Sequence, residues 1–257
     1  MSSASDPPDF PPPFELKPLP LELWPSVEHI VTEVDAPLNN VFSQKQMRLL
    51  TESLYASWQP ESPFIAFANV GLFYGVNLPP LVPNVMLCVD ARPTENLLPK
   101  LRRSYFAWAY GKSPEVAIEI VSDREGKEDT DKMKIYNNFR VCYYYIFDPE
   151  HHLSDETLRG YRLLGSEYEL MTDPASTTET IGLGLTLWNG RYEDTDGLWL
   201  RWVDPNGELI ATGFESAQQQ NQRAEEEARR VNEMMIENKR LVKLLNQHGI
   251  DPHDLVT

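Results

Sequence analysis

The chain has 257 residues, of which 41% are hydrophobic and 24% charged, so it is long enough for one domain with a sizeable core plus extensions. Its 23 Lys and Arg residues against 39 Asp and Glu give a formal charge of −16, which disfavours tight non-specific binding to nucleic acids. No charged-then-apolar leader and no run of about 18 apolar residues occurs. Export and membrane spanning are therefore not expected, and the cytoplasm is the predicted compartment.

The N-terminal segment is rich in proline, with seven prolines among the first twenty residues. Proline fixes φ and removes a backbone donor, so residues 1–24 are predicted to form an extended arm. The folded domain is then predicted to span residues 25–212. Apolar residues recur at helical spacing between Asn40 and Trp58, which predicts an amphipathic helix that packs on the core.

The next segments predict strands separated by a basic connection. Two aromatic and apolar runs, residues 64–74 and 82–90, are typical of strands. Between residues 93 and 112 basic and aromatic residues cluster. This pattern favours a solvated connection and leaves open a strip that contacts a nucleic-acid backbone. The cluster contains Lys100, Arg102, Arg103, Tyr105 and Trp108.

One carboxylate lies inside an apolar strand. The run from Val116 to Val121 is β-rich and apolar except for Glu119, as expected for a strand covered on both faces. An isolated buried charge is strongly unfavourable, so Glu119 requires a proton, a cationic partner or a metal ion. Among the cations, Lys132 is the expected partner, and Lys134 is less suitable because it points from a different side of the predicted helix over residues 128–140.

Acidic residues gather between this strand and the following helix. We interpret them as a solvated loop and helix start, because acids in a first turn complement the helix dipole. They are Asp123, Glu125, Glu128, Asp129 and Asp131.

Further strands are predicted downstream. The run from Val141 to Phe147 is a second buried strand, closed by a turn at Asp148 and Pro149. Four later runs are typical of strands and are expected to form a β-rich appendage. They cover residues 161–171, 182–188, 197–203 and 208–212.

The C-terminal segment, residues 213–257, is predicted to be a helix. From about Ser216 the composition changes to Gln, Glu, Arg and Ala, with no proline before Pro252. A short coiled coil and a lone surface helix both fit, since five residues fall on an a/d heptad seam with an asparagine at an a position. These are Val231, Met234, Asn238, Leu241 and Leu245.

Taken together, three stretches resemble the Uma-type restriction endonuclease family, a cyanobacterial type within the PD-(D/E)XK nuclease superfamily. They are PEVAIEIVS at residues 114–122, Lys132 four residues before Tyr136, and YYYIFDP at residues 143–149. The resemblance implies an α/β (α+β) fold. The implied fold has a restriction-endonuclease-like mixed sheet flanked by helices, with extra β-hairpins and a C-terminal helix.

The resemblance also implies chemistry. Two acids of the family hold a divalent ion, usually Mg²⁺ and alternatively Mn²⁺, and a lysine assists the attack of water on a DNA phosphodiester. Glu119 matches the second acid, and Lys132 matches the lysine. The first acid would fall at residue 84, where this chain has Asn84. An amide oxygen can ligate a hard cation but brings no charge, so metal affinity and water activation should be weaker.

Two other acids, Asp90 and Glu115, are candidates to take the place of the acid that is missing at residue 84. At about 3.3 Å per residue, Asp90 lies roughly 20 Å from residue 84, and Glu115 lies roughly 13 Å from Glu119. Neither reaches the site unless a bulge or bend interrupts its strand.

Two functions therefore remain open. One is a Mg²⁺-dependent DNA endonuclease, weakened by Asn84, and it is favoured by the retained Glu119 and Lys132. The other is a catalytically inactive nuclease-fold module that dimerises or recruits a protein partner through its C-terminal helix. Asn84 and the net charge of −16 favour this second function.

Overall fold

The computed structural model describes residues 18–26, 40–93, 96–122, 127–176 and 181–247. Most of the proline-rich arm, residues 1–24, lies outside these ranges, as do Asp123 and Glu125 of the acidic segment. The chain divides into two compact units, residues 1–210 and 211–257. Within the described ranges, no helix has the length and apolar content that crossing a membrane requires.

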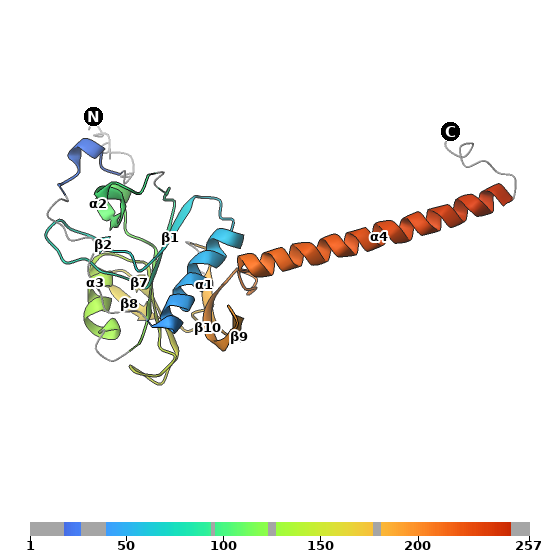
Figure 1. The fold of residues 1–257 in the computed structure, drawn as a ribbon. Helices are drawn as coiled ribbons and strands as arrows, with labels where there is room; N and C mark the ends of the chain where they lie inside the picture. Colours follow the sequence, from blue (N-terminus) through green and yellow to red (C-terminus); the bar gives the residue numbers. More distant parts are fainter. Residues whose placement is uncertain (1–17, 27–39, 94–95, 123–126, 177–180, 248–257) are drawn as a thin grey trace, which may run out of the picture. The chain divides into compact units, whose positions relative to one another are not determined.

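The first unit is built on a mixed six-stranded sheet with the order β1-β3-β5-β6-β7-β8 (Figure 1). Strands β5 and β6 pair in parallel, and the other neighbours pair antiparallel. This arrangement confirms the predicted α/β fold with a mixed sheet. The strands are β1 (Phe64–Ala68), β3 (Val85–Val89), β5 (Val116–Ile120), β6 (Tyr143–Phe147), β7 (Leu158–Leu164) and β8 (Glu167–Leu170).

Two small sheets and short helices complete this unit. A parallel pair joins β2 (Leu72–Phe73) to β4 (Tyr105–Phe106), and an antiparallel hairpin joins β9 (Gly184–Tyr192) to β10 (Thr195–Val203). The helical elements are η1 (Leu21–Leu23), α1 (Val41–Ser57), η2 (Lys100–Arg102), α2 (Ala107–Tyr110), the π-helical turn η3 (Glu128–Lys132) and α3 (Met133–Asn138).

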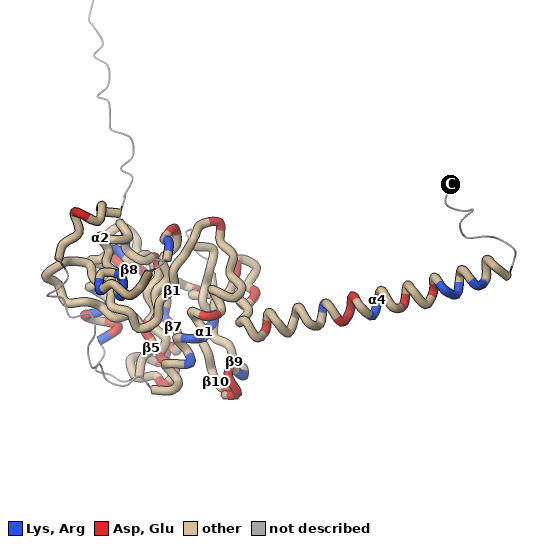
Figure 2. Tube along the Cα trace, turned by 45° about the horizontal axis from the view of Figure 1, so that its top comes forward, with Lys and Arg blue, Asp and Glu red and all other residues tan. Residues whose placement is uncertain are grey.

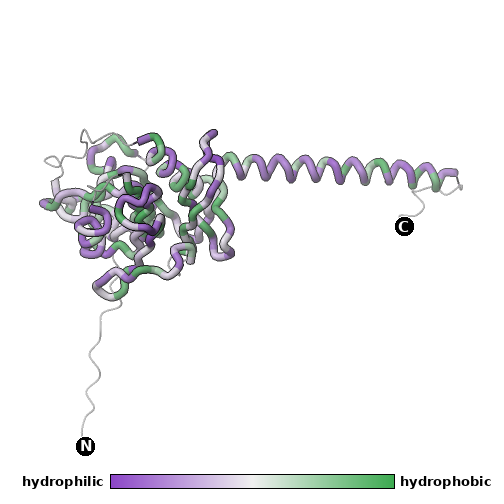
Figure 3. Tube along the Cα trace, turned by 90° about the horizontal axis from the view of Figure 1, so that it is seen from below, coloured by the Kyte–Doolittle hydropathy of each residue, from purple (hydrophilic) through white to green (hydrophobic). Residues whose placement is uncertain are grey.

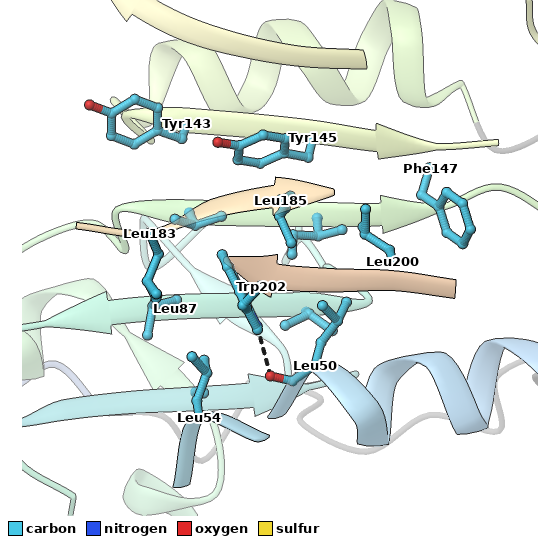
Figure 4. Packing of buried hydrophobic residues seen from close by; sticks show 14 of the residues in the cluster. Leu50, Leu54, Leu87, Tyr143, Tyr145, Phe147, Leu183, Leu185, Leu200 and Trp202 are labelled. Carbon is cyan, nitrogen blue, oxygen red and sulfur yellow. Dashed lines mark hydrogen bonds between the residues drawn. The ribbon is translucent and has the colours of Figure 1, made fainter. Parts of the chain in front are cut away.

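One face of the main sheet is covered by α1 and the β9–β10 hairpin (Figure 1). The side chain of Asn40 starts α1 by accepting a hydrogen bond of 2.7 Å from the Ser43 N–H, a usual N-cap. Figure 4 shows the packing on this face, where the Trp202 indole donates 2.8 Å to the Leu50 carbonyl. This contact fixes the hairpin on the helix, and the hairpin is the extra β-structure expected from the sequence.

The other face of the sheet is covered by α3 and carries the candidate site. Along β5, Ile118 and Ile120 belong to the core under α1, whereas Ala117 and Val121 belong to the core under α3. Side chains alternate along a strand, so Glu119 lies on the α3 face. The strand is covered on both sides, as its composition predicts.

Two of the strands predicted downstream, and the sheet to which one of them was assigned, are corrected by the structure. Residues 161–171 form parts of two strands, because the chain turns at Gly165, whose φ is +60°. Those strands, β7 and β8, extend the main sheet rather than the appendage. Residues 208–212 form no strand and only a bridge between Leu209 and Val203, which is held by two backbone hydrogen bonds, from the Asp204 N–H to the Glu208 carbonyl and from the Ile210 N–H to the Trp202 carbonyl.

The second unit contains one long helix, α4 (Gly213–Gln247). It begins with a capping box, in which the Thr212 hydroxyl accepts from the Glu215 N–H at 3.2 Å and the Glu215 carboxylate accepts from the Thr212 N–H at 2.8 Å. Charges of both signs are interspersed along α4 (Figure 2), and hydrophilic residues predominate (Figure 3). None of its described residues is buried.

Candidate active site

Glu119 lies at the centre of a buried polar cluster. Its side chain is 2% exposed. The Tyr136 hydroxyl donates to Oε1 at 2.7 Å, and the Lys132 ammonium donates to Oε2 at 3.2 Å. Lys134 is exposed, so the cationic partner of Glu119 is Lys132, as the helix spacing predicts.

Glu128 joins the same cluster. Lys132 Nζ lies 3.0 Å from Glu128 Oε1, and the two residues are four apart on η3. Glu128 is 6% exposed, so its interpretation as a solvated acid is wrong. The sequence held a signal for this position, because Glu128, Lys132 and Tyr136 follow each other at intervals of four residues and therefore share one side of a helix.

The cluster holds one firmly charged cation and one destabilised carboxylate. Burial raises the pKa of Glu119 above its ordinary value of 4.5, and Lys132 and Tyr136 offset this only in part. Burial lowers the pKa of Lys132, but the Glu119 and Glu128 carboxylates outweigh that effect and raise it above 10.5. Burial also raises the pKa of Tyr136 well above 10, so its hydroxyl remains a donor.

Asn84, which the sequence resemblance predicts to stand at the first-acid position, lies beside the backbone of β5. Its Oδ1 accepts a hydrogen bond of 2.8 Å from the Ile120 N–H, directly after Glu119. Its Nδ2 lies 3.9 Å from the Met47 sulfur on α1, and Met47 belongs to the core on the face away from Glu119. Asn84 directly precedes β3, so its amide connects the start of β3 to β5 and to α1. One lone pair of the amide oxygen is engaged by the main chain of β5.

Neither alternative acid reaches Glu119. The β3–β5 pairing runs in regular antiparallel register from Val85 with Ile118 to Leu87 with Val116. Glu115 accepts a hydrogen bond of 2.8 Å from the Val89 N–H and pairs with Lys112. Asp90 is exposed and follows the end of β3.

A second cation lies on the same face of the sheet. Glu119 is opposite Ile146 on β6, and Ile146 is opposite Arg159 on β7, so all three share a face. The Arg159 guanidinium lies 3.9 Å from the Asp129 carboxylate and is 11% exposed. Its Nε and Nη2 are buried and have no hydrogen-bond partner within the described chain. Arg159 carries no signal in the sequence alone, because only the strand register reveals which face it occupies.

Of the two aromatic residues singled out in the basic cluster of residues 93–112, one lies inside the fold. Tyr105 is fully buried and donates to the Lys112 carbonyl at 2.9 Å. Trp108 is half-buried and packs beside Phe106. The Tyr105 ring is thus used inside the fold and cannot stack on exposed bases, whereas the Trp108 ring is covered only in part.

Glu119 is expected to make the metal-free protein less stable as the pH rises. A carboxyl whose pKa is raised on folding holds its proton more tightly in the folded state than in the unfolded chain. Its contribution to stability is fully present below the ordinary pKa of 4.5 and is lost as the pH rises through the folded pKa. Urea unfolding in EDTA should show the wild type losing free energy of unfolding relative to Glu119→Gln as the pH is raised above the ordinary pKa of 4.5. Parallel pH profiles for the two proteins would contradict this.

Comparison with known proteins assigns the chain to a family. The Uma2 family model, described as "Putative restriction endonuclease", matches residues 22–189. A solved structure titled as a putative nuclease belonging to DUF820, from Anabaena variabilis, has 16% sequence identity and a TM-score of 0.40, covering 56% of this chain and 75% of that chain. No curated protein matches. Because the family model covers more than half of the sequence, the chain belongs to the Uma2 family, described as putative restriction endonucleases.

Proposed function

We propose that the protein is a Mg²⁺-dependent DNA endonuclease, in which Glu119 binds the metal ion and Lys132 assists the attack of water on a phosphodiester. The observation that carries the proposal is the contact of 3.2 Å between the buried Glu119 carboxylate and the Lys132 ammonium. An acid and a lysine in contact are the pair that the family's chemistry requires. Asn84 stands at the first-acid position and makes the site weaker than one with two family acids.

Each residue of the cluster has a distinct task in this proposal. Lys132 keeps its proton, since its pKa is raised, so it donates hydrogen bonds and offsets negative charge that develops on the phosphate. Tyr136 holds one oxygen of Glu119 and fixes the orientation of the carboxylate. Hydrolysis adds water across one P–O bond and yields a phosphate monoester and a free hydroxyl. A bound divalent ion supplies Lewis acidity, which activates water and neutralises phosphate charge.

The donor chemistry of the cluster suits a hard divalent cation. Carboxylate oxygens are the ligands that Mg²⁺ prefers, and Mg²⁺ commonly keeps several waters beside one or two carboxylates. Both oxygens of Glu119 retain a lone pair beyond the hydrogen bonds they accept. Among the described residues no group of three or more His, Cys, Asp or Glu side chains is arranged to hold a metal. A site with few protein ligands therefore fits Mg²⁺ or Mn²⁺ better than Zn²⁺.

Plasmid and single-stranded DNA incubated with the purified protein in Mg²⁺ or Mn²⁺ test the proposal. We expect nicking or linearisation that requires the divalent ion, stops in EDTA and is lost in Glu119→Ala and Lys132→Ala. Exposed Lys134→Ala is the matched control and should cleave as the wild type does. Absence of cleavage at every metal concentration would refute the endonuclease function. Cleavage at the wild-type rate by both Glu119→Ala and Lys132→Ala would refute it as well.

Restoring an acid at residue 84 is expected to strengthen metal binding. In Asn84→Asp one carboxylate oxygen can still accept from the Ile120 N–H, which now bonds the amide oxygen at 2.8 Å. The substitution adds a negative charge at the backbone of Ile120, one residue from Glu119, and affinity for a hard cation rises with the charge of its ligands. Titration calorimetry with Mg²⁺ should show a gain on the order of tenfold. An unchanged affinity would mean that Asn84 is not the weak point of the site.

A second candidate function rests on α4. In this reading the nuclease fold is catalytically inactive and the chain associates with a second copy of itself through the heptad seam. Seam residues Val231, Met234 and Leu241 are 45%, 64% and 49% exposed, and a helix of 35 residues with an apolar seam is typically stabilised by packing against another helix. Asn238 at an a position is typical of two-stranded coiled coils.

Light scattering on the full chain tests the association. Leu241→Glu places a charge on the seam at a d position, whereas Ile236→Glu places the same charge at an f position on the outer side. Ile236 is 60% exposed, so the two substitutions are matched in chemistry. A dimeric wild type that becomes monomeric only in Leu241→Glu supports the coiled coil. A monomeric wild type at all concentrations rules it out.

A further inference from the structure

Glu128 is the least satisfied carboxylate of the buried cluster. It is 6% exposed. Its Oε1 accepts from Lys132 at 3.0 Å, but its Oε2 is buried and has no hydrogen-bond partner within the described chain. A buried carboxylate oxygen without a donor is costly, so the position of Glu128 calls for a partner that this chain alone does not supply.

The fold holds Glu128 at this place. The Tyr144 hydroxyl on β6 donates 2.8 Å to the Glu128 carbonyl, which fastens η3 to the sheet. Neighbouring Lys127 has a φ of +56°, an unusual value for a residue other than glycine. The position of Glu128 is therefore set by the sheet, and the burial of its side chain does not depend on the exposed acids of the same segment.

Charge is unbalanced in this part of the molecule. Among the described residues, the ion pairs of this cluster join the carboxylates of Glu119, Glu128 and Asp129 to the cations Lys132 and Arg159. Three negative charges meet two positive charges, because Lys127 is engaged at the surface by Asp131. Asp129 is 30% exposed, but Glu119 and Glu128 are both buried and share the single cation Lys132. The negative charge left over at this pair is removed either by a proton or by a further cation.

We infer that Glu128 supplies the second carboxylate of the divalent-cation site, in the role that Asn84 cannot fill. This inference rests on the proposed function. The Lys132 ammonium contacts Glu119 at 3.2 Å and Glu128 at 3.0 Å, so a single cationic centre reaches both carboxylates. Two carboxylates with waters and substrate phosphate are a common ligand set for Mg²⁺. Lys132 is 31% exposed on a flexible stem, which lets it move aside and remain nearby.

Binding of Mn²⁺, followed by electron paramagnetic resonance, tests the inference without measuring cleavage. The wild type, Glu119→Gln, Glu128→Gln and Asp131→Asn are compared. We expect both glutamate variants to bind Mn²⁺ on the order of tenfold more weakly or worse, because each loses a charged ligand. Asp131 belongs to the same segment but is 59% exposed, so Asp131→Asn should bind as the wild type does.

Two further results separate the possible failures. If Glu128→Gln binds Mn²⁺ and cleaves DNA as the wild type does while Glu119→Gln does neither, the role of Glu128 is wrong and the proposed function stands. If the wild type neither binds Mn²⁺ nor cleaves DNA, both are wrong. Glu128→Asp keeps the charge and should bind Mn²⁺ more tightly than Glu128→Gln. An equal loss in these two variants, with a lowered melting temperature in both, would indicate a packing defect and contradict the ligand role.

Discussion

Glu119→Gln is expected to lose at least about 10²-fold in the rate of Mg²⁺-dependent DNA cleavage, the scale of losing one preorganised electrostatic group in an active site. Glutamine has the shape of glutamate and retains an oxygen for the Tyr136 hydroxyl, which donates at 2.7 Å. The substitution removes the negative charge, and a neutral amide is a poor ligand for a hard cation. Initial rates of plasmid nicking at saturating Mg²⁺ measure the loss.

Glu115→Gln is the matched control for this prediction. Glu115 is also buried, at 7% exposure, and also pairs with a lysine, Lys112. It lies at the other end of β5 and holds the Val89 N–H at 2.8 Å, a task that a glutamine oxygen can take over. We expect Glu115→Gln to nick DNA at nearly the wild-type rate. Similar losses in both variants would mean that buried acids of β5 matter for folding rather than for chemistry.

Lys132→Met is expected to lower the free energy of unfolding by about 3 kcal/mol at pH 7. Removing one partner of a buried ion pair leaves an uncompensated charge and costs about 3–5 kcal/mol, and the partial exposure of Lys132 places the loss at the lower end. In this variant Glu119 can take up a proton, which removes the uncompensated charge and limits the loss of stability. Protonating the carboxyl costs about 1.4 kcal/mol for each pH unit above its ordinary pKa of 4.5, so the cost falls at lower pH. The loss should therefore shrink towards pH 5, as urea unfolding at both pH values can measure.

Lys127→Met provides the control at equal geometry. Lys127 pairs with Asp131 at 3.1 Å and Lys132 pairs with Glu128 at 3.0 Å, and both pairs are four residues apart. They differ in burial, since Lys127 and Asp131 are 64% and 59% exposed. Surface pairs contribute about 0–1 kcal/mol, so Lys127→Met should unfold almost as the wild type does at both pH values. A Lys132→Met variant as stable as this control would show that the cluster is screened by water.

The sequence was sufficient to predict the core of the fold and the central pair of the site. An apolar strand interrupted by one acid predicts burial on both faces, and Glu119 is indeed enclosed on both sides of β5. Spacing by four residues predicts that Lys132 and Tyr136 share a side, and both contact Glu119. These predictions succeed because strand alternation and helix periodicity are local properties that the pattern of residues records directly.

Other parts of the site could not be predicted because they depend on tertiary register. Arg159 reaches the face of Glu119 only through the pairing of β5 with β6 and of β6 with β7. Glu128 resembles any first-turn acid until the Tyr144 hydroxyl of β6 fixes its backbone. Strands β7 and β8 were expected outside the main sheet, since an alternating pattern does not specify which sheet a strand joins.

The most direct measurement of the central claim is an anomalous difference map from a crystal of the protein soaked in Mn²⁺. We expect a peak about 2.1 Å from the carboxylate oxygens of Glu119, at the distance typical of a hard cation with oxygen ligands, with Glu128 as its second protein ligand. We also expect Lys132, now 3.2 Å from Glu119, to be displaced from between the two carboxylates. A map without a peak at Glu119, with Lys132 still bridging both acids at saturating Mn²⁺, would contradict the proposed metal site.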